Sequence, residues 1–215
     1  MKSSMLKGLL FALLGLTGMS ALGFDQTGRE HHGHDQHSGM PHTPLPMTSR
    51  VPEGSLHQLD AVWQTHRGDA LTLADLAGRP VIITMLYASC TTACPVLVQD
   101  VKRIYQALPE ARRSQAALLL VSFDTEGDTP EALNQYAQSV RADGEAWHFA
   151  TGSAADVRTL AALLGVRYRK NPSGGYDHSN VIAVLNAKGE VVHRQEGLNQ
   201  PVTGAVKAVS LDGGA

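Results

Sequence analysis

The chain has 215 residues and a nearly balanced charge, with 18 Lys or Arg residues against 20 Asp or Glu residues and a formal net charge of −2 at pH 7. This balance excludes the strongly basic surface that is typical of nucleic-acid-binding proteins. The chain has only 2 cysteines, too few for a disulfide-stapled scaffold, so we expect their thiols to serve chemistry.

Residues 1–23 have the pattern of a secretory signal peptide. Lys2 and Lys7 form a positive n-region, Gly8 to Leu16 form an apolar h-region, and Ala21 to Gly23 resemble a cleavage site. The apolar run is short for a bilayer span, which favours cleavage over a permanent anchor. We therefore expect an exported, periplasmic protein; the alternative is that the uncleaved segment anchors it to the membrane.

Residues 24–55 are predicted to form a disordered linker, because their apolar residues are too sparse to offset the entropy of ordering. The segment is rich in histidine and methionine, namely His31, His32, His34, His37, His42, Met40 and Met47. Imidazoles in such tracts bind Cu, Zn or Ni. Two hypotheses remain open, a metal-binding linker and a solvated tether whose metal binding is incidental.

Residues 56–215 are predicted to form one domain in which strands alternate with helices. Val81–Tyr87 and Ala117–Phe123 are continuous apolar runs, typical of buried strands. From Pro95 onward the apolar residues recur with helical spacing. A further helix is predicted to begin at Thr129-Pro130, since proline is favoured at the first helical position.

The second half of the domain continues this alternation. A short strand is predicted over Trp147–Ala150, followed by a helix that Ser153 caps and Gly165 ends. Two further strands, Val181–Leu185 and Glu190–His193, are joined by a tight turn. The order of the elements predicts an α/β, thioredoxin-like fold with a central mixed sheet flanked by helices.

Both cysteines, Cys90 and Cys94, lie where the strand Val81–Tyr87 ends and the helix from Pro95 begins. Reactive groups collect at this edge of an α/β sheet, and the positive end of the helix dipole lowers a thiol pKa. A structural disulfide, a redox-active dithiol and a metal site are all compatible with this position. The spacing is one residue wider than the usual C-x-x-C redox motif, and two thiolates with an imidazole suit Cu(I).

His178 is the candidate third ligand. It follows a glycine-rich hairpin predicted at residues 171–175 and precedes the strand Val181–Leu185. In a thioredoxin-like sheet the loop before this strand packs against the cysteine turn. We therefore favour a metal-ligating His178 over a structural one. The remaining histidines of the domain, His57, His66, His148 and His193, are expected at the surface.

The chain resembles the Sco/SenC family of exported, thioredoxin-fold copper chaperones over about residues 65–200. Four stretches carry the resemblance: Cys90-Thr-Thr-Ala-Cys94-Pro95, Asp124-Thr-Glu-Gly-Asp128-Thr129-Pro130, Trp147-His-Phe-Ala-Thr-Gly152 and Asp177-His178-Ser179. The resemblance implies that Cys90, Cys94 and His178 bind copper, as Cu(I) or Cu(II). It also implies that Asp128 lies near the copper, although helix capping beside Thr129 is an equal alternative.

The sequence departs from the family at two places in these stretches. Thr91 and Thr92 stand where the family often has Pro-Asp, and Gly127 replaces a frequent arginine. These departures leave the predicted ligands intact but bear on partner specificity.

The function predicted from the sequence is delivery of copper to the CuA centre of a respiratory cytochrome oxidase. The expected partners are the copper-bearing oxidase subunit or another periplasmic cuproprotein, and a protein that donates copper. An alternative is a periplasmic thiol–disulfide oxidoreductase that uses Cys90 and Cys94 to keep the acceptor's cysteines reduced. A third hypothesis is metal buffering by the histidine-rich linker. Beyond thiol–disulfide exchange, no enzymatic activity is expected.

Overall fold

The computed structural model describes residues 54–211. The predicted signal segment 1–23 and the five candidate histidines of the linker lie outside this range. Of the predicted linker 24–55, only residues 54 and 55 lie within it. Within residues 54–211, no helix has both the length and the apolar character needed to cross a membrane.

A mixed sheet of seven strands forms the centre of the domain, in the order β2-β1-β5-β4-β3-β8-β9. Strands β3, β4 and β5 are parallel to one another, whereas β1, β8 and β9 pair antiparallel to their neighbours. The bounds of the strands are β1 Trp63–Thr65, β2 Ala70–Leu71, β3 Val81–Leu86, β4 Ala117–Ser122, β5 Trp147–Thr151, β8 Val181–Leu185 and β9 Val191–Glu196.

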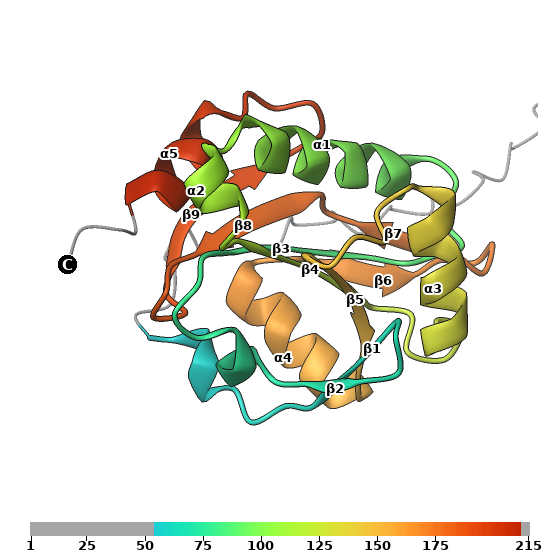
Figure 1. Ribbon diagram of the computed structural model, residues 1–215. Helices are drawn as coiled ribbons and strands as arrows, with labels where there is room; N and C mark the ends of the chain where they lie inside the picture. The colour runs from blue at the N-terminus through green and yellow to red at the C-terminus, as the bar shows by residue number, and fades with distance from the viewer. Residues whose placement is uncertain (1–53, 212–215) are drawn as a thin grey trace, which may run out of the picture. The chain divides into compact units, whose positions relative to one another are not determined.

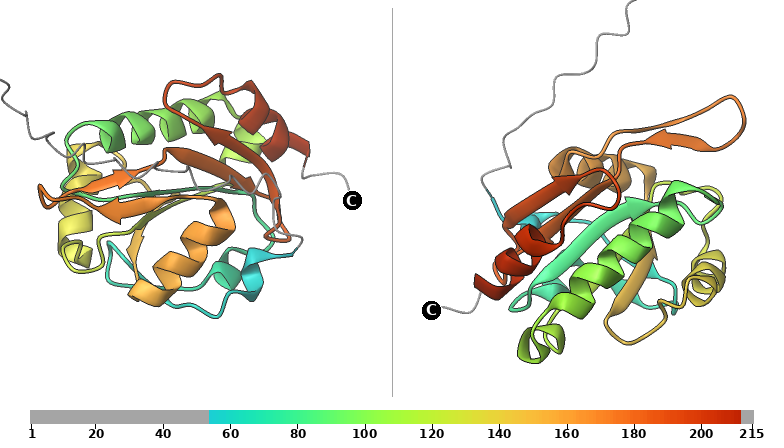
Figure 2. Two further views of the ribbon diagram at one scale, coloured as in Figure 1. Left: turned by 180° about the vertical axis from the view of Figure 1, so that it is seen from behind. Right: turned by 90° about the horizontal axis from the view of Figure 1, so that it is seen from above.

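Helices cover both faces of this sheet (Figure 1, Figure 2). Side chains of α1, α3 and α5 pack together on one face, and side chains of α4 pack on the other. The helices are α1 Ala93–Ala107, α2 Glu110–Arg113, α3 Pro130–Ser139, α4 Ala154–Leu164 and α5 Thr203–Leu211, with 3-10 turns η1 Leu56–Gln58 and η2 Leu73–Leu76.

Strand β3 separates the two hydrophobic cores. Ile83 and Met85 point into the core beneath α4, whereas Ile82 and Leu86 point into the core beneath α1. Successive side chains of a strand face opposite sides of the sheet, so a strand covered on both faces favours apolar residues at nearly every position. The one polar residue of β3, Thr84, is fully buried and donates its hydroxyl to the carbonyl of Val181 at 2.6 Å.

The predicted helix ends are also observed. The hydroxyl of Thr129 accepts the N–H of Ala132 at the start of α3, and the hydroxyl of Ser153 accepts the N–H of Asp156 at the start of α4. Gly165 ends α4 with a φ of 70°, a conformation that glycine adopts without steric cost. The predicted mixed α/β, thioredoxin-like fold is confirmed.

Several short elements were not predicted. These are β1, β2, both 3-10 turns, α2 and α5. The hairpin predicted at residues 171–175 is observed, with β6 (Tyr168–Lys170) and β7 (Tyr176–His178) as its two strands. The strand predicted to end at His193 continues to Glu196. The hairpin lies at the end of the sheet where α1 begins (Figure 1), so it brings the third predicted ligand toward the cysteines.

Candidate metal centre

The two cysteines are held by the turn that connects β3 to α1. The N–H of Cys90 donates to the carbonyl of Tyr87 at 3.3 Å, which closes the turn. Thr92 precedes α1 but its side chain makes no capping hydrogen bond. Instead the sulfur of Cys90 accepts the N–H of Cys94 at 3.4 Å. A thiol sulfur therefore takes the place of a side-chain oxygen at the start of the helix.

The turn shifts the pKa values of the two thiols in opposite directions. Burial raises the pKa of Cys90, but hydrogen bonds from the N–H groups of Cys94 and Thr92 outweigh it and lower that pKa to about 6. Cys94 is fully buried, and burial raises the pKa of its thiol far above the ordinary range. At neutral pH the site therefore holds one thiolate and one thiol.

His178 faces the cysteines from the end of β7. Its Nε2 lies 3.7 Å from the sulfur of Cys94, and its Nδ1 lies 3.2 Å from the carbonyl oxygen of Ser179. A carbonyl oxygen only accepts hydrogen bonds, so the neutral ring has its proton on Nδ1 and its lone pair on Nε2, the nitrogen that faces the sulfur. This is the usual orientation of a metal-ligating histidine.

One atom each from Cys90, Cys94 and His178 lies within 4.8 Å of the other two. Two sulfur ligands about 2.3 Å from one metal ion stand at most roughly 4.6 Å apart, so the three donors need only a small contraction to share an ion. Their chemistry, two sulfurs and one imidazole, suits copper or zinc.

Aromatic rings surround His178. The ring centroids of Phe123 and Tyr87 lie 5.1 Å and 6.0 Å from that of His178, and Tyr176 packs against both rings. Sequence reasoning missed these residues. The available signal was that Tyr176 and His178, two positions apart in one strand, must share a face.

Asp128 lies beside the centre but is not one of the three clustered donors. Its carboxylate is buried and accepts the N–H of Ala88 at 2.8 Å and the hydroxyl of Ser122 at 2.5 Å. The capping alternative is wrong, because the hydroxyl of Thr129 caps α3. Asp128 instead fixes the backbone of the cysteine turn, two residues before Cys90.

The family model described as SCO1/SenC matches residues 58–210. The chain belongs to the SCO1/SenC family. It is 27% identical over 143 residues to a candidate copper-binding protein of Stutzerimonas stutzeri, with 65% of this chain and 68% of that protein covered. It is 22% identical over 139 residues to the SCO1 protein homolog of Bacillus subtilis (strain 168), with 63% of this chain and 72% of that protein covered.

Solved SCO1/SenC structures share the fold. Arabidopsis thaliana ScoI with copper bound has a TM-score of 0.62 at 21% identity, over 70% of this chain and 96% of that one. BsSco, described as a member of the Sco family of cytochrome c oxidase assembly proteins, also has a TM-score of 0.62 at 21% identity, over 73% of this chain and 93% of that one.

The histidines expected at the surface of this SCO1/SenC domain are not fully exposed. For His66 the expectation is wrong: it is 4% exposed, and its Nδ1 accepts the N–H of Phe149 at 3.2 Å. Because β1 is short, the side chain of His66 takes over the pairing with β5 at the point where the strand ends. His57, His148 and His193 are half-buried.

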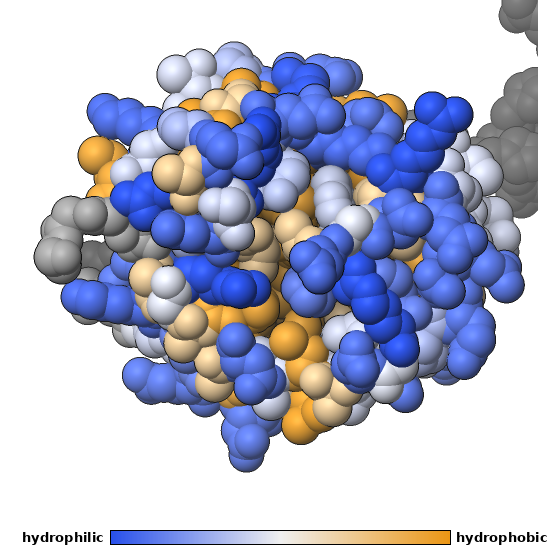
Figure 3. Space-filling model, in the orientation of Figure 1, coloured by the Kyte–Doolittle hydropathy of each residue, from blue (hydrophilic) through white to orange (hydrophobic). Residues whose placement is uncertain are grey.

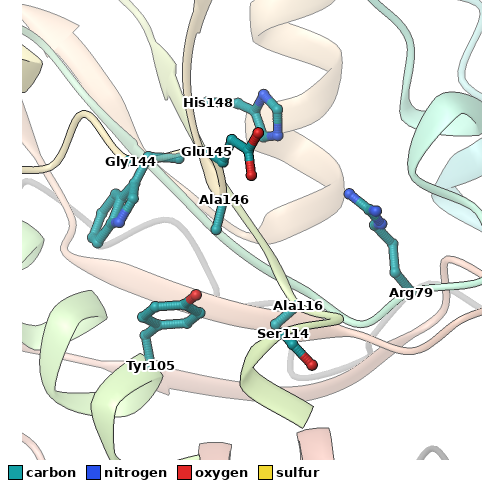
Figure 4. Close-up of a pocket in the computed structure, with 9 residues that line it drawn as sticks. Arg79, Tyr105, Ser114, Ala116, Gly144, Glu145, Ala146 and His148 are labelled. Atoms are coloured by element: carbon teal, nitrogen blue, oxygen red, sulfur yellow. The ribbon is translucent and has the colours of Figure 1, made fainter. Parts of the chain in front are cut away.

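A separate pocket of about 550 Å³ lies at the opposite end of β3, β4 and β5. Figure 4 shows Arg79 and Glu145 extending toward the same space, with Tyr105 below them and His148 nearby. None of the predicted site residues lines this pocket.

The surface in Figure 3 is mostly hydrophilic, with apolar side chains gathered near its centre. A different pocket of about 430 Å³ is lined by His178 itself, together with Tyr168 and Asp177.

Proposed function

We propose that this protein is exported, binds one copper ion through Cys90, Cys94 and His178, and delivers it to the CuA centre of a cytochrome oxidase. The observation that carries the proposal is the clustering of two sulfurs and one imidazole nitrogen within 4.8 Å. Membership of the SCO1/SenC family supports copper as the metal, since solved structures of Arabidopsis thaliana and Bradyrhizobium japonicum ScoI hold copper. The signal-like segment 1–23 supports export.

The three residues contribute to copper binding in different ways. Cys90 offers a thiolate at neutral pH because its pKa is lowered to about 6, whereas Cys94 must release its proton when it becomes a ligand. Nε2 of His178, 3.7 Å from the sulfur of Cys94, accepts a hydrogen bond from that thiol until the metal replaces the proton. A second protein that offers equal or better thiolate and imidazole donors receives the ion by ligand exchange.

Thiol–disulfide exchange is the second candidate function, and the acidity of Cys90 favours it. A thiolate is the attacking species in exchange, and a lowered pKa makes it available at neutral pH. Both cysteines are buried, but Cys90 is 6% exposed and Cys94 is fully buried, so Cys90 is the more accessible of the two and Cys94 suits the role of resolving cysteine. In this function the protein reduces a disulfide of the acceptor while Cys90 and Cys94 become oxidised to a disulfide.

A copper titration of the reduced full-length protein tests the proposal. We expect one Cu(I) per chain with high affinity, and we expect the same in a variant in which His31, His32, His34, His37 and His42 are all changed to Ala. Loss of tight binding in that variant would assign copper to the linker and refute the domain site. Oxidation to the disulfide should abolish binding, because it removes both sulfur donors.

A further inference from the structure

The hairpin that carries His178 is attached to the loop between β4 and α3. The hydroxyl of Tyr176 donates to Oδ1 of Asp124 at 3.1 Å, and Lys170 forms an ion pair of 3.1 Å with Glu126. The side chains of Lys170 and Glu126 are 57% and 81% exposed. Exposed ion pairs contribute little, so of these two contacts the half-buried hydrogen bond of Tyr176 is the stronger one.

Gly127 makes room for this contact. Its N–H donates to Oδ1 of Asp124 at 3.2 Å, the same oxygen that accepts from Tyr176. A Cβ at position 127 would lie 2.5 Å from Oδ2 of Asp124, closer than real Cβ contacts. The φ of Gly127 is not positive, so the absence of a side chain, rather than special backbone freedom, is what the contact requires. Gly127 is also a position where this chain departs from the family pattern.

The same loop holds the cysteines. Asp128 follows Gly127 directly, and its carboxylate accepts the N–H of Ala88 in the cysteine turn at 2.8 Å. One short loop is thus bonded to the hairpin that carries the nitrogen donor and to the turn that carries both sulfur donors. Its two carboxylates fix the spacing between these donors.

We propose that Tyr176 and Asp124 are positioning residues that hold the imidazole of His178 against the two thiols, and that Gly127 permits their contact. This inference rests on the proposed copper site. While the hydrogen bond is formed, the two sulfurs and the imidazole nitrogen face one point. When it breaks, the hairpin moves His178 away and leaves the two sulfurs, from which copper passes more readily to an acceptor. The hydrogen bond therefore sets the rate at which copper is released.

Two variants remove this hydrogen bond by different routes. Tyr176→Phe deletes the hydroxyl and keeps the ring against Tyr87 and Phe123. Gly127→Ala displaces the carboxylate of Asp124 and keeps the hydroxyl. In the reduced, metal-free protein, each variant should speed hydrogen exchange of the amides in 168–179 about tenfold, as expected for a lost bond to a charged group. Hydrogen exchange in the double variant should be about as fast as in either single variant, because both changes remove the same hydrogen bond.

Lys170→Gln is the matched control, since it breaks the exposed ion pair of the same hairpin; exchange should stay within about twofold of wild type. Copper-loaded Tyr176→Phe should still bind one ion but release it about tenfold faster, and the nitrogen splitting in the EPR spectrum of its Cu(II) form should weaken. Unchanged hairpin exchange in Tyr176→Phe overturns the inference, as does additivity of the two variants. If wild type binds no copper, the proposed function fails, while the exchange data still decide the positioning role.

Discussion

The lowered pKa of Cys90 leads to a quantitative prediction for its reactivity. In the Cys94→Ser variant, Cys90 is the only thiol and keeps the two backbone N–H groups that lower its pKa most, while a serine hydroxyl replaces the Cys94 side chain, which contributes less. With a pKa of about 6 instead of the ordinary 9.0, about 90% of Cys90 is ionised at pH 7, against about 1% of an ordinary thiol. The thiolate population therefore rises about 90-fold.

The rate of alkylation should rise much less than the thiolate population. A thiolate loses nucleophilicity as its pKa falls, with a Brønsted coefficient near 0.4–0.5, so three pKa units cost roughly 20-fold per thiolate. The net gain at pH 7 is then only about fourfold over an ordinary thiol of equal accessibility, and the 6% exposure of Cys90 lowers its rate further. The position of the pH profile is more telling than the absolute rate, since it depends on ionisation alone.

The assay is alkylation of reduced, metal-free Cys94→Ser with iodoacetamide between pH 4.5 and pH 9. We expect the rate to level off above a midpoint near pH 6. The matched variant Cys90→Ser leaves the buried thiol of Cys94, whose raised pKa should keep its rate rising up to pH 9. A midpoint above pH 8 in Cys94→Ser would show that burial outweighs the backbone hydrogen bonds and would refute the reasoning.

Three further predictions follow from the site. Cys90→Ser and Cys94→Ser should each abolish tight Cu(I) binding, because one thiolate and one imidazole make an incomplete soft site; equilibrium dialysis against a Cu(I) buffer measures this. Asp128→Ala should lower the free energy of unfolding of the metal-free protein by about 2–4 kcal/mol in urea titrations, since it leaves unpaired the buried hydroxyl of Ser122 and the half-buried N–H of Ala88. His66→Ala should destabilise the domain by about 1–3 kcal/mol by stranding the N–H of Phe149, without changing copper affinity.

Much of the fold was predictable because its strands are buried on both faces. The sequences of β3 and β4 do not alternate between apolar and polar residues, which is typical of strands buried on both faces. The helix caps at Thr129 and Ser153 are local signals that act over three residues. The strands β1 and β2 have only 3 and 2 residues, too few to show a period. Helix α5 buries only Ala205 and Val209, so its apolar stripe is faint.

The candidate site was predictable only in part, for a different reason. Cys90 and Cys94 lie at a strand–helix junction that local pattern reveals, and His178 precedes a buried strand. The contacts that adjust these residues are long-range: Asp128 reaches Ala88 across 40 positions, and Tyr176 reaches Asp124 across 52. No local period encodes such pairs. The sequence pointed to Asp128 but not to its partner, so its role as an anchor of the cysteine turn stayed hidden.

His178→Ala separates copper delivery from thiol–disulfide exchange. Nε2 lies 3.7 Å from the thiol of Cys94, so the imidazole serves either function, as a copper ligand or as a base for that proton. As a ligand, its loss should lower Cu(I) affinity at least about tenfold at every pH where both thiols can be metallated, while the dithiol potential shifts by less than about 30 mV. As a base, its loss should slow the attack of Cys94 on a mixed disulfide and leave copper affinity unchanged. Competition with a Cu(I) chelator and a glutathione redox titration on the same variant distinguish the two. Unchanged copper affinity would remove His178 from the ligand set and leave exchange as the function of the two cysteines.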